Sequence, residues 1–206
     1  MIDQSVILDA ARALHLVGLA LGVGLAFLAD LTAWRAMFRP LYEPEHEMLH
    51  RLHNLVACGI ILLWVSGLVI LWHRTGFQLD QFSPKLMVKL AVVSMLTFNA
   101  FAIAQFALPA ILHYRGFRFG EIPLMDRMRL GAIAGLSTTC WISALALGVF
   151  SQMKTMDYSE LADTFAPLVA VVLGASLALA LLSPVVSFVS GRLSARNRTG
   201  REAAWR

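Results

Sequence analysis

The sequence predicts an all-α fold, a polytopic membrane bundle of five transmembrane helices, and two observations support this prediction. Hydrophobic residues make up 58% of the 206-residue chain and charged residues only 15%, a composition too apolar for an ordinary soluble domain. Apolar runs recur along the chain, and each is long enough to cross a bilayer core of about 30 Å as a helix. We therefore expect a multi-pass membrane protein whose main partner is the lipid bilayer.

Prolines help to define where the helices begin and end. Pro44 suits the first turn of a helix, so a polar stretch from residue 44 leads into the second span. Pro84 suits the start of the third helix, and Pro109 should bend or end that helix. The five spans are predicted at residues 8–34, 52–72, 86–112, 130–152 and 164–189.

The basic residues predict the orientation and the domain organisation. Twelve of the 17 Lys and Arg residues fall on the side of the membrane that also holds the C-terminus. Because cytoplasmic loops carry an excess of basic residues, we expect the N-terminus outside and the C-terminus inside, in the inner (cytoplasmic) membrane. Residues 1–191 form one transmembrane domain and residues 192–206 a basic cytoplasmic tail. The basic residues lie in short stretches between apolar runs, so no nucleic-acid partner is expected.

The stretch His46-Glu47-Met48-Leu49-His50 has the letter pattern of a zinc protease. Such an enzyme places two histidines one turn apart on a helix and needs a third ligand from elsewhere. Glu47 also lies four residues before Arg51, a spacing that favours an ion pair on a helix. No second protease motif follows. We therefore interpret the stretch as the polar start of the second helix, with His53 as its best candidate for a buried role.

Ionisable residues within the spans fall into two layers. The inner layer, near the cytoplasmic ends, consists of Asp30, His46, His50, His53 and His113. Ionisable groups within a membrane are rare unless they are paired or functional, so these residues are candidate metal ligands or members of a proton relay. The alternative for Asp30 is a buried ion pair with Arg35, Arg51 or His53.

The outer layer consists of His15 in the first span, Lys89 in the third and His73 at the end of the second. On a helix His15, Gly18 and Gly22 fall close to one face. Small residues beside an intramembrane histidine either let another helix approach closely or leave room for a flat porphyrin whose iron the histidine binds. Both alternatives stay open.

The stretches "ALHLVGLALGVGLAFLADL", "RLHNLV" and "VKLAVVSML" resemble the first three helices of the HemJ-type membrane protoporphyrinogen oxidases and their wider CopD (copper-resistance D) relatives. The resemblance covers roughly residues 10–110. It implies bound haem b and functional roles for a first-helix histidine and a third-helix lysine, which fall on His15 and Lys89. The family's oxidase usually has four helices, so the span at 164–189 is additional here.

Three functional hypotheses follow. The first is binding of haem b or a transition metal within the first three helices, with a redox or electron-transfer role, and a haem-dependent oxidoreductase is its enzymatic form. The second is transport of copper or protons across the membrane through the two polar layers. The third is a non-catalytic assembly factor or subunit, in which small-residue faces pack on a membrane partner or a second copy of the chain.

Overall fold

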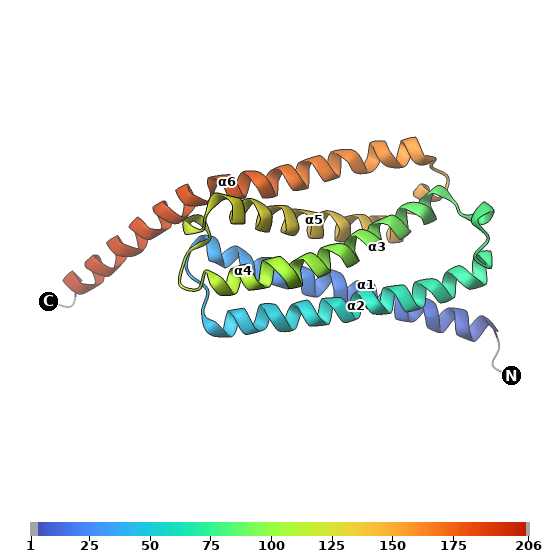
Figure 1. Cartoon of the computed structure of the whole chain (residues 1–206), viewed down its shortest axis with the longest axis horizontal. Helices are drawn as coiled ribbons and strands as arrows, with labels where there is room; N and C mark the ends of the chain where they lie inside the picture. Colours follow the sequence, from blue (N-terminus) through green and yellow to red (C-terminus); the bar gives the residue numbers. More distant parts are fainter. Residues whose placement is uncertain (1–3, 205–206) are drawn as a thin grey trace.

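The computed structural model describes the backbone of residues 4–204 and the side chains of residues 4–192. It confirms an all-α bundle with five helical segments long and apolar enough to cross a membrane (Figure 1). The first segment consists of α1 and a short 3-10 turn (Arg35–Met37), the third is interrupted, and the other three are single helices. The helices are α1 (Gln4–Trp34), α2 (Glu43–Thr75), α3 (Pro84–Ala102), α4 (Leu108–His113), α5 (Leu124–Val149) and α6 (Tyr158–Ala204).

The starts of α2 and α3 lie at the prolines that the sequence singled out. Pro44 occupies the first turn of α2, where the Tyr42 amide donates to the Glu45 carboxylate at 2.9 Å. Pro84 is the first residue of α3, and the Ser83 hydroxyl accepts a hydrogen bond from the Leu86 amide at 3.3 Å. Both residues suit a first helical turn because that turn has no intrahelical partner for its N–H groups.

The third span contains a π-helical turn at Ile103–Ala107, between α3 and α4. Pro109 follows this turn within the first two residues of α4. Proline lacks an N–H and its ring crowds the preceding turn, and a widened turn accommodates that crowding. The chain therefore stays helical through Pro109 as far as His113, with a changed hydrogen-bond pattern just before the proline.

The bundle has two ends, which we name by their composition. The arginine-rich end holds the α1–α2 connection, the segment between α4 and α5 and the final turns of α6. At this end Arg39 pairs with Glu45 at 2.7 Å, and Arg115 pairs with Glu43 at 2.7 Å. The opposite end, called the N-terminal end, holds the start of α1 and the end of α2.

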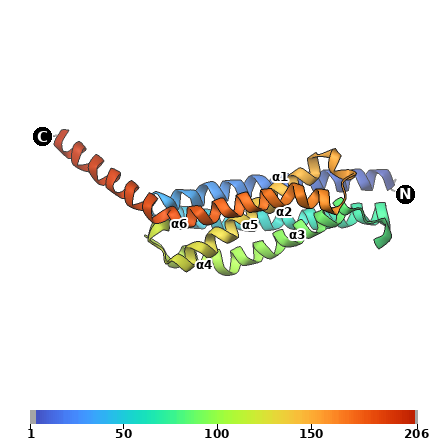
Figure 2. The ribbon, with the colours of Figure 1, turned by 90° about the horizontal axis from the view of Figure 1, so that it is seen from above.

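Two views show how the helices are arranged. Helix α1 lies along α2, and α5 lies along α6 (Figures 1 and 2). The basic tail predicted at 192–206 continues α6 as a helix to Ala204, and this last part projects beyond the bundle (Figure 1). The start of α1 and the end of α6 lie at opposite ends of the molecule, as an odd number of spans requires.

Candidate functional site

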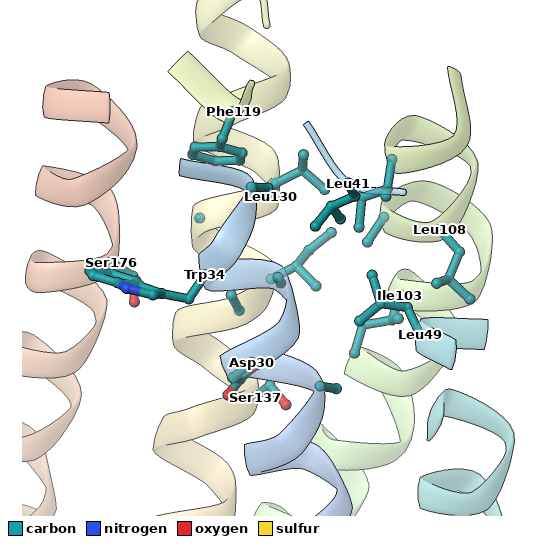
Figure 3. Close-up of a pocket in the computed structure, with 18 of the residues that line it drawn as sticks. Asp30, Trp34, Leu41, Leu49, Ile103, Leu108, Phe119, Leu130, Ser137 and Ser176 are labelled. Carbon is teal, nitrogen blue, oxygen red and sulfur yellow. The ribbon is translucent and has the colours of Figure 1, made fainter. Parts of the chain in front are cut away.

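A cavity of about 330 Å³ lies in the half of the bundle nearer the arginine-rich end. Residues of α1, α2, α4, α5 and α6 line it, and most of them are apolar. Figure 3 shows Asp30 and Ser137 toward one end of the cavity and Leu41 and Phe119 toward the other. Its polar side chains are Asp30, His46, His53, Tyr114, Ser137, Thr138 and Ser176.

Small residues leave the space that the cavity occupies. On α1 the lining residues Ala26, Ala29 and Ala33 follow one another at helical spacing, and on α5 Gly131 and Ala134 do the same. A methyl group fills little of the volume between helices, so the alanines leave space beside α1 and α5. Gly131 instead lets α6 approach closely, because an added Cβ would lie 3.0 Å from the Cβ of Ala180. The small-residue face of α1 thus has two parts: glycines that pack directly on α2, and alanines that border the cavity.

Asp30 is the only carboxylate that lines the cavity among the described residues. Its Oδ2 lies 3.2 Å from the hydroxyl of Thr138, which also lies 3.0 Å from the carbonyl oxygen of Ala134. Within residues 4–192 no basic side chain forms an ion pair with Asp30. The predicted pairing with Arg35, Arg51 or His53 is therefore not found.

The arginines considered as partners for Asp30 bind elsewhere. Arg35 lies 3.5 Å from Glu45, and Arg51 lies 3.5 Å from Glu47. The second of these is the pair that the four-residue spacing on the helix predicts. Asp30 keeps only a hydroxyl as its described polar partner, which leaves the carboxylate facing the cavity as a group that can take up a proton or a cation.

The histidines of the inner layer separate into two groups. His53 is half-buried and lines the cavity, whereas His50 and His113 are exposed. His50 lies 3.4 Å from the Asn54 amide nitrogen, and the His113 ring contacts that of Tyr114 edge-to-face at 4.8 Å. The structure therefore brings Asp30 and His53 to one cavity and leaves the two exposed histidines outside it.

His46, the first histidine of the zinc-protease pattern, also lines the cavity. It lies seven residues before His53, which places both rings on one face of α2. Its Nδ1 atom is buried and has no hydrogen-bond partner. Burying a polar atom without a partner costs about 1–3 kcal/mol, so this nitrogen is suited to bind a water molecule or a ligand in the cavity. The seven-residue spacing was the available sequence signal.

Tyr114 lies just beyond the third span and also lines the cavity. Its hydroxyl donates to Asp126 Oδ2 at 2.5 Å. This hydrogen bond raises the pKa of Tyr114 above its usual value, because it favours the protonated phenol. Tyr114 therefore stays neutral at physiological pH and ties the segment after α4 to the start of α5.

A hydrophobic core lies between the cavity and the N-terminal end. Its buried members come from α1, α2, α3 and α5: Ala26, Val56, Ile60, Leu63, Leu96, Cys140 and Trp141. Trp141 is only 4% exposed. This core separates the inner polar layer from the outer one.

In the outer layer, His15 packs against α2. Its Nδ1 lies 3.0 Å from the hydroxyl oxygen of Ser66, which itself donates to the carbonyl oxygen of Leu62. In the tautomer that carries the ring proton on Nδ1, His15 donates to the Ser66 oxygen. Its Nε2 keeps a lone pair, which is the form that a metal or haem iron requires.

Gly18 and Gly22 serve the close approach of helices. A Cβ atom added at Gly18 would lie 3.0 Å from the backbone oxygen of Gly59 on α2, and one added at Gly22 would lie 2.1 Å from the ring of Trp141 on α5. This face is filled by protein atoms and does not fit a porphyrin lying against the two glycines. Binding of haem b or a metal through His15 Nε2 stays a prediction.

Lys89 and His73 differ in their relation to His15. Lys89 is half-buried and lies within electrostatic range of the His15 ring. His73 is exposed and lies seven residues beyond Ser66, which is about 10 Å along the axis of α2. Lys89 therefore acts on His15 only through its charge, and His73 lies at the end of its helix.

The described side chains contain no group of three or more His, Cys, Asp or Glu residues placed to hold a metal ion. Comparison with protein-family models, with curated proteins and with solved structures found no match. The resemblance to the HemJ and CopD proteins stays a prediction from the quoted stretches of sequence.

Proposed function

We propose that the chain is a proton-transport protein of the inner membrane, with the cavity as its cytoplasmic half-channel. The observation that carries the proposal is the Asp30 carboxylate, which faces the cavity from within a membrane span and has no ion-pair partner among the described residues. An ionisable group within a membrane usually marks an ion or substrate pathway.

The other cavity residues support a proton pathway. A cavity of about 330 Å³ holds several water molecules when polar groups line it. His46 and His53 add two imidazoles, a group that can both accept and donate a proton. Water, imidazole and carboxylate groups together allow a proton to pass from the arginine-rich end to Asp30.

Transfer across the whole membrane requires the hydrophobic core beside Trp141 to open. Beyond that core, His15 and Lys89 provide ionisable groups in the half toward the N-terminal end. A proton would then pass from one polar layer to the other in separate steps. The closed core would prevent a continuous path for protons across the membrane. Copper transport and a haem-dependent redox role stay predictions.

Proton flux in proteoliposomes tests the proposal. The full chain is reconstituted with a pH-sensitive dye enclosed, a membrane potential is imposed, and the initial rate of pH change is recorded. We expect the native chain to exceed protein-free vesicles and Asp30→Asn to reduce the rate to that of protein-free vesicles. Asparagine retains the oxygen that accepts from Thr138, so the local packing is preserved.

Asp163→Asn is the matched control, because it removes the same charge from an exposed position near the start of α6. This variant should keep the native rate, and Asp30→Glu should keep a measurable part of it. Equal flux in Asp30→Asn and the native chain, or flux no greater than that of protein-free vesicles in the native chain, would contradict the proposal.

A further inference from the structure

Four cationic side chains gather at the N-terminal end of the bundle. Lys85 and Lys89 lie one turn apart at the start of α3, Arg74 is in the last turn of α2, and Lys154 ends the short helix η5 (Ser151–Lys154). The Lys89 ammonium group is close enough to be repelled by the charges of Lys85, Arg74 and Lys154. We call these four residues the cation cluster.

Packing holds helix α3 and the short helix η5 together at the cation cluster. Lys85 is only 7% exposed, and its Nζ donates to the carbonyl oxygen of Phe150 at 2.7 Å. Met153, next to Lys154, belongs to a small hydrophobic cluster against which Val88 of α3 packs. The lysines of α3 and η5 are therefore brought together by the fold and are not independent surface side chains.

No carboxylate of the described chain neutralises the cluster. Within residues 4–192 none of its four members forms an ion pair. At the same end of the bundle, Asp9 pairs with Arg12 at 2.9 Å. Asp80, in the connection between α2 and α3, is exposed and forms no ion pair within the described residues. Asp157 and Glu160 accept hydrogen bonds from backbone amides in the first turn of α6.

The backbone adds to the positive potential. The first turn of α3 contains no acidic residue and instead carries Lys85. A helix N-terminus has a partial positive charge, which disfavours nearby cations and favours nearby anions. The cation cluster and the start of α3 thus raise the electrostatic potential at the same place. A bound anion would lower that potential.

We propose that the cation cluster binds a phosphate group at the membrane surface of the N-terminal end. The position at the ends of α2 and α3 is where a span leaves the hydrocarbon and meets the level of lipid phosphates. Lysine binds phosphate as a point charge, and two N–H groups of Lys85 remain beyond the one given to Phe150. The source of the phosphate is a lipid headgroup or a soluble phosphate.

Equilibrium titration of the detergent-solubilised full chain tests the proposal and separates the two sources. One arm uses short-chain phosphatidic acid, and the other uses inorganic phosphate. Binding of phosphatidic acid alone identifies a lipid headgroup site, and binding of both identifies a site open to soluble phosphate. Either result supports the proposal, whereas binding of neither overturns it.

Variants locate the site. Arg74→Gln and Lys154→Gln are exposed positions, so both should fold. Each cation near an anionic surface contributes a factor of about five in affinity, so the double variant should bind about 25-fold more weakly. The control is Arg12→Gln with Arg129→Gln, which removes two exposed arginines outside the cluster. An unchanged affinity in the double variant, or an equal loss in the control, would overturn the assignment.

Discussion

Gly22 has no side chain, and this allows helices α1, α2 and α5 to pack closely at one point. Its Cα lies where the ring of Trp141 crosses α1, and the backbone of Gly59 on α2 packs beside it. The sequence identified Gly22 as a small residue but could not say what filled the adjacent space. The structure answers that question with an indole ring, which contributes to the core between the two polar layers.

Substitution of Gly22 by alanine should destabilise the chain. The added Cβ would lie 2.1 Å from the Trp141 ring, and overpacking of this kind costs about 1–3 kcal/mol. Gly24→Ala is the matched control, because no atom lies within 4 Å of its added Cβ. Thermal unfolding of the detergent-solubilised chain should show a lower midpoint for Gly22→Ala only. A midpoint unchanged by Gly22→Ala would mean that Trp141 moves aside at little cost.

The predicted role of His15 as a haem ligand can be tested by absorption spectroscopy. If His15 Nε2 binds haem iron, the purified chain shows a Soret band that His15→Ala abolishes. Ser66→Ala should shift the band, because it removes the oxygen that fixes the ring at 3.0 Å. Arg12→Gln, three residues away and exposed, should leave the spectrum unchanged. A colourless preparation would remove this role from His15.

At the level of single elements, the start of α6 is defined by a reciprocal cap. The Glu160 amide donates to Asp157 Oδ1 at 2.9 Å, and the Asp157 amide donates to Glu160 Oε2 at 3.0 Å. These bonds satisfy amides that have no partner within the helix. The amide of Glu160, followed by the hydroxyl of Ser159, lowers the pKa of Asp157 by stabilising its ionised form.

This cap should weaken in acid. Because the pKa of Asp157 is lower in the folded chain than in the unfolded chain, its contribution is complete above the unfolded value, near 4, and is lost as the pH falls through the folded value. Hydrogen exchange of the Glu160 amide, corrected for the intrinsic effect of pH, should therefore become faster in that window. Asp157→Asn, which cannot ionise, should remove the pH dependence. A dependence that persists in this variant would assign it to another group.

The positions of the helices could be predicted from the sequence, whereas their rotations could not. Long apolar runs and the prolines at 44 and 84 define the spans, because bilayer thickness and missing N–H groups act locally. Runs that are apolar on every side do not reveal which face packs inward. The contact of Trp141 with Gly22 and that of Asp30 with Thr138 depend on the rotation of α5, so neither was predicted.

At the scale of the whole molecule, the two polar layers lie on opposite sides of one hydrophobic core. The sequence predicted both layers from their depth in the spans. It could not predict that the inner layer borders a cavity and that His50 and His113 lie outside it, because those outcomes depend on five helices at once. The buried nitrogen of His46 without a hydrogen-bond partner could not be predicted for the same reason, since it is recognised only when the neighbours of His46 are known.

The orientation of the chain can be tested with reporter fusions. Twelve of the 17 Lys and Arg residues belong to the side of the arginine-rich end, so we expect that end in the cytoplasm. A fluorescent protein that folds only in the cytoplasm should be bright when fused after residue 206, and alkaline phosphatase should be active when fused before residue 1. The reverse pattern would invert the assignment and place the cavity mouth outside.

Helix α6 has 47 residues, which corresponds to a length of about 70 Å, whereas a bilayer with its headgroups measures about 40–45 Å. The surplus continues the membrane span as a helix that bends away from the bundle (Figures 1 and 2). Because the projecting part is long, a small change in the tilt of the span moves the end of the helix by a larger distance. A spin label near residue 204 would report rearrangements inside the bilayer that are too small to follow at the span itself.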